Sequence, residues 1–92
     1  MNPPINLPLT IHVTQEDIDE GVQEDCERCP VARAVERATG ISTVVQFERI
    51  SVNCQNKVVF VTPTYVRIFI KAFDETRLVT PFSFTLTEND RV

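Results

Sequence analysis

The sequence predicts a small α+β domain with an antiparallel or mixed sheet of about four strands and two main helices, in the order β-α-α-β-β-α-β. Apolar and polar residues alternate over residues 9–13 and 82–87, which is typical of strands buried on one face. Residues 64–74 instead carry an apolar stripe with helical spacing. The 92 residues, of which 42% are hydrophobic and only two are glycine, are enough for one ordered domain.

We expect this single domain to span residues 9–87. Residues 1–8 contain three prolines and are predicted to form a flexible N-terminal arm, and residues 88–92 a C-terminal tail. The chain has no run of the roughly 20 apolar residues that cross a membrane, and residues 1–4 do not resemble the start of a signal peptide. We therefore expect a cytoplasmic protein without membrane contact, whose thiols are reduced.

The first predicted strand, residues 9–13, leads into a short helix at residues 15–20. Thr14 is followed three residues later by Asp17, and this pair is typical of the start of a helix. Gly21 is expected to end the helix.

A second helix is predicted at residues 31–39. Pro30 suits a first helical position because its missing N–H would have no partner there, and Gly40 is expected to end the helix. The residues with helical spacing on its apolar face are small: Val31, Ala34, Val35 and Ala38. This helix is therefore expected to pack closely on the sheet.

Residues 50–61 predict a β-hairpin with a tight turn at Gln55-Asn56. The alternation of apolar residues changes phase at Glu48-Arg49, just before the hairpin. This change predicts a bulge or a turn there in place of one straight strand.

The strongest amphipathic helix is predicted after Thr62-Pro63, before the last strand at residues 82–87. Its apolar stripe consists of Val66, Phe69, Ile70 and Phe73. Tyr65 and Ile68 widen this stripe beyond one packing face. A neighbouring loop could cover them; if they are exposed, we expect a homodimer with two-fold symmetry through this face.

The acidic residues are unevenly distributed. Seven of the thirteen form an acidic segment that contains no Lys or Arg: Glu16, Asp17, Asp19, Glu20, Glu24, Asp25 and Glu27. The net charge is −4, so the rest of the chain is mildly basic, and we expect no direct nucleic-acid binding. The segment is either a solvated loop that aids solubility or a surface that docks on a basic partner. The second interpretation makes its first six members candidate interaction residues.

Cys26 and Cys29 precede the second helix, where unpaired N–H groups and the helix dipole favour a thiolate or a bound anion. One interpretation is a zinc site, with Cys54 and His12 as the remaining ligands. Another is a thioredoxin-like redox pair, although the neighbouring carboxylates would raise the thiol pKa values. The third is that the thiols are structural, with a local disulfide on oxidation.

Each proposed zinc ligand outside the pair also has a structural interpretation. Cys54 shares the phase of Ile50 and Val52 and is expected in the core, while His12 lies on the polar face of its strand and is expected at the surface.

Other catalytic or ligand-binding sets are absent from the sequence. A single His has no Ser or Cys nucleophile beside it, and two glycines cannot form a phosphate-binding loop. The pattern Asp17-x-Asp19-x-Gly21 lacks the further ligands of a calcium loop. We infer no apolar pocket beside the acidic segment, so its carboxylates are expected to face solvent. We predict a protein that is not an enzyme and has no cofactor, zinc being the alternative.

Three groups of residues carry a resemblance to known sequences: Thr14-Gln15-Glu16-Asp17-Ile18 with Gly21, Cys29-Pro30-Val31-Ala32 with Ala34, and Phe69, Phe73 and Asp74 with Pro81, Phe82, Phe84 and Leu86. Through them the chain resembles a family of small uncharacterised proteins from bacteriophages and their bacterial hosts, over most of residues 9–86. The resemblance implies an accessory protein of a phage or mobile element and assigns no activity to any residue. We therefore expect an interaction module that binds or inhibits a host protein.

Overall fold

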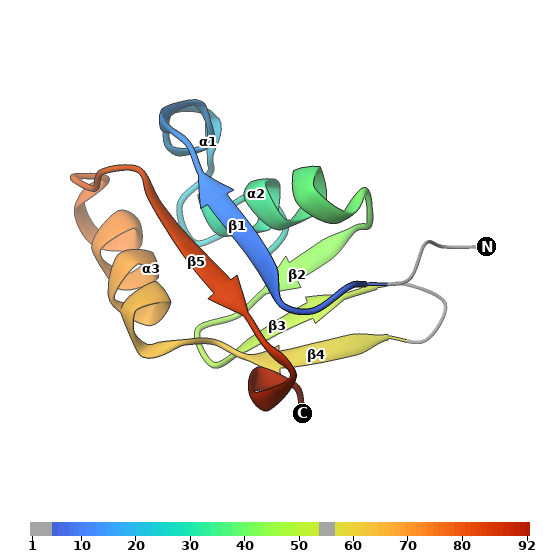
Figure 1. Ribbon diagram of the computed structural model, residues 1–92. Helices are drawn as coiled ribbons and strands as arrows, with labels where there is room; N and C mark the ends of the chain where they lie inside the picture. Colours follow the sequence, from blue (N-terminus) through green and yellow to red (C-terminus); the bar gives the residue numbers. More distant parts are fainter. Residues whose placement is uncertain (1–4, 54–56) are drawn as a thin grey trace.

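The computed structural model describes residues 5–53 and 57–92. These residues form five strands and three α-helices in the order β-α-α-β-β-β-α-β, followed by the short 3₁₀ helix η1 (Glu88–Asp90) (Figure 1). The predicted α+β class is confirmed. The single sheet of about four strands is replaced by two antiparallel sheets, one of two strands and one of three. None of the helices in the described ranges is long and apolar enough to cross a membrane.

The smaller sheet pairs the two strands that the alternation predicted. β1 (Leu9–Val13) runs antiparallel to β5 (Phe82–Leu86), with Ile11 opposite Phe84. Both of these side chains are buried, whereas His12, which alternates with them, is exposed as predicted. One face of the sheet therefore contributes to the core and the other faces solvent.

The larger sheet has the order β2-β3-β4 and contains the predicted hairpin. β3 (Arg49–Val52) and β4 (Val58–Val61) pair antiparallel, with Ile50 opposite Phe60, and both side chains are fully buried. The predicted turn at Gln55-Asn56 lies outside the described residues.

The additional strand, β2 (Thr43–Val45), results from the phase change that the sequence shows at residues 48–49. The N–H of Gln46 donates to the carbonyl of Arg49 at 2.8 Å, which closes a turn and folds β2 back onto β3. Phe47 lies in this turn and is exposed, so it does not continue the buried face of Val45. The expected bulge or turn is therefore a turn between two strands.

The first two helices begin and end at the predicted residues. α1 (Gln15–Glu20) carries a capping box between Thr14 and Asp17. α2 (Pro30–Thr39) starts with Pro30 in its first turn and ends at Gly40, whose φ of 71° is left-handed. α2 packs against β1 and β2 through its small apolar residues. Ala38, expected on that face, is exposed because it lies near the helix end, beyond the packed turns.

α3 (Thr64–Thr76) lies beside β5 (Figure 1). Its buried residues are Val66, Phe69 and Phe73, which join the core formed by both sheets and α2. The Phe69 ring contacts that of Phe82, with ring centroids 4.5 Å apart. The predicted apolar stripe thus attaches the helix to the domain.

Tyr65 and Ile68 lie outside this packed stripe, with exposed fractions of 48% and 65%. The edge of the Tyr65 ring contacts Phe82, but the Ile68 side chain is largely open to solvent. Both residues are therefore exposed, which is the condition under which the sequence predicts a homodimer. The homodimer itself stays a prediction.

An Ile68→Glu variant tests this prediction. Because Ile68 is exposed, we expect the free energy of unfolding to change by no more than about 0.5 kcal/mol. Sedimentation at micromolar concentration is expected to give a dimer for the parent protein and a monomer for the variant. A monomeric parent contradicts the predicted association.

The residues on either side of the predicted domain also contact it. Ile5 and Leu7, from the expected N-terminal arm, pack partly buried against the core. Arg91 forms a bridge with Phe60, and the N–H of Val92 donates to the carbonyl of Val59 at 2.8 Å. Part of the expected C-terminal tail therefore lies along β4.

Candidate functional site

A cavity of about 390 Å³ lies between the loop that precedes α2, the end of β2 and the last two turns of α3. Its apolar lining consists of Val45, Phe47 and Ile70. We call this cavity the acidic groove because of the residues around it. The expectation that no apolar pocket adjoins the acidic segment was wrong, because Val45, Phe47 and Ile70 line a cavity together with Glu24 and Asp25. These apolar residues are distant from the acidic segment in sequence, so the segment itself does not predict them.

Four carboxylates line the acidic groove: Glu24, Asp25, Asp74 and Glu75. Lys71 is the one basic residue among its lining residues. Within residues 5–53 and 57–92, none of the four carboxylates has a basic nitrogen within the 4.0 Å of an ion pair. The groove therefore combines an apolar surface with an excess of negative charge.

Asp25 shapes the loop beside the groove through its own hydrogen bonds. Its Oδ1 atom accepts the N–H groups of Glu27 and Arg28 at 2.9 and 3.0 Å. Its carbonyl accepts the N–H of Cys29 at 3.1 Å, which closes one helical turn. An Asp side chain that satisfies free N–H groups in this way defines the start of a turn. The carboxylate is thus held in place by its local sequence.

Asp74 joins the end of α3 to this loop. Its Oδ1 atom accepts the N–H of Glu24 at 2.9 Å, and Glu24 has a left-handed φ of 56°. The Gln23 amide donates to the carbonyls of Phe73 and Asp74 at 2.9 and 3.1 Å. These contacts satisfy carbonyls that a helix end leaves free. They also bring carboxylates from residues 50 positions apart into one groove.

Arg77, directly after α3, fixes the other side of the same loop. Its guanidinium donates to the carbonyls of Ile18, Asp19 and Gly21 at 2.9, 3.2 and 3.1 Å. The side chain of Asp19 remains exposed and accepts a hydrogen bond from Gln15 at 2.8 Å. The loop therefore has a defined position relative to α3, although it carries few apolar residues.

Asp74 and Glu75 are functional candidates that the sequence interpretation missed. They lie in the last turn of α3, where the helix dipole disfavours negative charge. In the sequence, the signal that could have identified them was a pair of adjacent carboxylates at the end of a helix where negative charge is unfavourable. Only the tertiary structure shows that they line one cavity together with Glu24 and Asp25.

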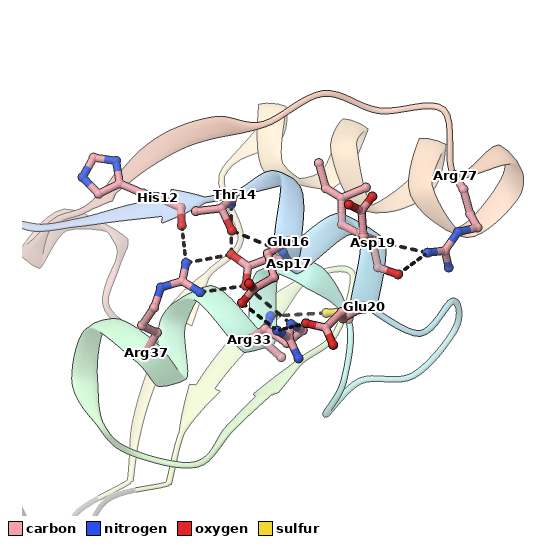
Figure 2. A network of polar contacts seen from close by, with 12 residues as sticks. His12, Thr14, Glu16, Asp17, Asp19, Glu20, Arg33, Arg37 and Arg77 are labelled. Carbon is pink, nitrogen blue, oxygen red and sulfur yellow. Dashed lines mark hydrogen bonds and ion pairs between the residues drawn. The ribbon is translucent and has the colours of Figure 1, made fainter.

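Asp17, a predicted interaction residue, is not at the surface. It is 0% exposed, and both of its oxygens accept hydrogen bonds from the Arg37 guanidinium at 2.7 Å (Figure 2). Thr14 donates its N–H to Oδ2 at 2.9 Å, and Arg37 also donates to the carbonyl of His12. Burial raises the pKa of Asp17, but hydrogen bonds from Arg37 and Thr14 outweigh it, so the pKa lies below its usual value. Its assignment to a docking surface was wrong.

The acidic segment is also divided in space. Arg33, on α2, lies 3.9 Å from Glu16 and 3.5 Å from Glu20, and these pairs partly offset the charge of α1. The segment contains no basic residue, but the fold supplies Arg33 from another element. Glu24 and Asp25 belong instead to the acidic groove. The acidic groove therefore contains only these two members of the acidic segment.

The two thiols of the Cys-x-x-Cys motif both line the acidic groove. Cys26 is exposed, whereas Cys29 is 6% exposed and is the N-cap of α2, its Sγ accepting the N–H of Ala32 at 3.4 Å. Burial raises the pKa of Cys29 to about 11, and Asp74 and Asp25 add to the increase. The helix N-terminus was expected to favour a thiolate, but for Cys29 burial outweighs the N–H groups of Ala32 and Val31, which act to lower the pKa.

The four predicted zinc ligands are only partly placed. His12 lies on the exposed face of β1, with Nδ1 2.7 Å from Ser83 Oγ, while Cys54 lies outside the described residues. In the described part of the chain, no three His, Cys, Asp or Glu residues are grouped so that they could hold a metal ion. Zinc binding stays a prediction, which a metal analysis of the purified protein tests.

No protein-family model, curated protein or solved structure matches this chain. The resemblance to phage proteins stays a prediction. The function is therefore inferred from the acidic groove, a concave surface with an unbalanced charge.

Proposed function

We propose that the protein is a non-enzymatic interaction module whose acidic groove binds a basic segment of another protein. The supporting observation is the set of four carboxylates without ion pairs in the described residues, around an apolar lining. A Lys or Arg side chain matches this combination. Its cationic end is attracted by the carboxylates, and its methylene groups can contact Val45, Phe47 and Ile70.

The groove is also suited to a protein segment in its size and rigidity. A volume of about 390 Å³ can hold one or two side chains, and the hydrogen bonds of Asp25 and Asp74 fix its rim before binding. Less ordering is then required when a partner binds. A phosphate-bearing ligand would be repelled by the same carboxylates, so nucleic acid is not the proposed partner.

The proposed biological role combines this surface with the predicted resemblance. An accessory protein of a phage or mobile element would bind, and thereby inhibit, a host protein through a segment rich in Lys and Arg. The groove defines this segment only by its chemistry: Lys and Arg residues with aliphatic residues between them.

A labelled peptide in which Lys and Arg alternate with Leu tests the proposal by fluorescence anisotropy. We expect the Glu24→Lys/Glu75→Lys variant to bind this peptide about tenfold more weakly than the parent protein, which corresponds to about 1.4 kcal/mol. Both side chains are exposed, so we expect the fold to be retained. Binding to the parent is expected to weaken as salt increases.

The matched control is Glu16→Lys/Glu88→Lys, which changes the net charge by the same amount. Glu16 lies on α1, and Glu88 lies in η1, which is far from the last turn of α3 (Figure 1). We expect the control to bind the peptide less than threefold more weakly than the parent, a change attributable to net charge. Equal losses in the two double variants, or no binding by the parent at low salt, would contradict a binding site in the groove.

A further inference from the structure

The two thiols of the acidic groove lie on one preformed turn. The hydrogen bond from Cys29 N–H to the carbonyl of Asp25, at 3.1 Å, closes a turn of α-helical size, and the Asp25 side chain holds the two N–H groups between them. In such a turn, Cα atoms three positions apart are separated by roughly 5 Å. Cys26 and Cys29 are three positions apart in this turn, which would place their Cα atoms at a separation that a disulfide can span.

The thiols differ in access but share one cavity. Cys26 is exposed, whereas Cys29 is 6% exposed, and both line the acidic groove. A reagent dissolved in water therefore reaches Cys26 first. The carbonyl of Cys26 also accepts the N–H of Val45 at 2.7 Å, which fixes this part of the turn against β2.

We propose that Cys26 and Cys29 form a redox modification site, at which a small-molecule disulfide such as oxidised glutathione converts the two thiols into an intramolecular disulfide. In the first step, Cys26 loses its proton to solvent and its thiolate attacks one sulfur of oxidised glutathione, whose S–S bond breaks. One glutathione thiolate leaves with the electron pair. The product is a mixed disulfide on Cys26.

Cys29 completes the exchange. It loses its proton to solvent and attacks the sulfur of Cys26, so that the new S–S bond forms and the second glutathione leaves as a thiolate. Both glutathione thiolates take up protons. Overall, two protein thiols are oxidised, and one oxidised glutathione is reduced to two molecules of glutathione.

The fold loses little when this bond forms. Cys29 Sγ gives up one weak hydrogen bond, from Ala32 N–H at 3.4 Å, whereas the bonds to Asp25 remain. The sulfur atoms are drawn together in the groove lining, so the oxidised protein has a different groove surface. This inference does not rest on the proposed binding of a basic segment.

Tryptic mapping of the wild-type protein gives a direct test. Arg28 separates the two thiols and is the first Lys or Arg of the sequence, so trypsin places Cys26 in fragment 1–28, Cys29 in 29–33 and Cys54 in 50–57. The folded protein is incubated with excess oxidised glutathione, alkylated and digested without reductant. We expect fragments 1–28 and 29–33 to be joined by a disulfide, with 50–57 alkylated, and dithiothreitol to separate the joined fragments.

Single variants test the order of the steps. Cys29→Ser keeps an N-cap residue, so it is expected to fold and to accumulate the mixed disulfide on Cys26. Cys26→Ser is expected to react about tenfold more slowly than Cys29→Ser, because Cys29 is buried. The proposal is overturned if the wild-type protein stops at the mixed disulfide, if fragment 50–57 joins either of the other two, or if the two variants react at equal rates.

Discussion

Replacing Asp17 by alanine is expected to lower the free energy of unfolding by about 3 kcal/mol, the largest effect of any acidic residue in this chain. Asp17 is fully buried and accepts two 2.7 Å hydrogen bonds from Arg37. It also accepts the Thr14 N–H at the start of α1. The substitution therefore removes the Asp17 half of the α1 capping box and leaves the half-exposed Arg37 guanidinium without its carboxylate. Urea denaturation of the two proteins measures the difference.

Glu16→Ala is the matched control, because Glu16 is an exposed neighbour in the same helix. Its ion pair with Arg33 is 3.9 Å long, so we expect a change of no more than about 0.5 kcal/mol. If both variants lose the same free energy of unfolding, the hydrogen bonds of buried Asp17 stabilise the fold no more than an exposed ion pair does.

The stabilisation by Asp17 is also expected to depend on pH. The pKa of Asp17 is lowered in the folded protein, so its contribution is present above the unfolded value of about 3.9 and is lost as the pH falls through the folded value. The stability difference between the parent and Asp17→Asn should thus shrink below about pH 4. A difference that stays constant from pH 7 to pH 2 would show that the charge of Asp17 is not involved.

Gly21→Ala is expected to destabilise the protein by about 2–3 kcal/mol, for a reason unrelated to backbone torsion. The φ of Gly21 is −68°, which any residue can adopt. A Cβ atom there would lie 2.7 Å from the carbonyl oxygen of Asp17 and 2.7 Å from ring carbons of Pro30. The backbone of α1 or the start of α2 must move to admit it. Thermal and urea unfolding of the variant measure this cost.

Gly40→Ala provides the opposite case. A Cβ atom at Gly40 would have no atom within 4 Å, but its φ of 71° is strained for alanine. We expect a loss of about 1 kcal/mol, smaller than at Gly21. A larger loss at Gly40 than at Gly21 would mean that backbone torsion matters more here than close packing.

The local elements of this protein could be predicted from its sequence. The Thr14–Asp17 capping box, Pro30 at the start of α2 and Gly40 at its end are each set by neighbouring residues, and all three are confirmed. The alternation in β1 and β5 also predicted which residues face the core. Such features depend on hydrogen bonds and periodicity within a few positions, so a single segment contains the information.

Contacts between distant parts of the chain determine which charges remain available. Asp17 belongs to the same acidic segment as Glu24, yet Arg37 of α2 buries the first and Asp74 of α3 places the second at a groove. Both carboxylates have the same local signal. The contacts that separate them, from Arg37 to the Asp17 side chain and from the Glu24 N–H to Asp74, involve residues 20 and 50 positions away. Whether a carboxylate is neutralised or exposed depends on these long-range contacts, because electrostatic interactions depend on distance in space and on burial.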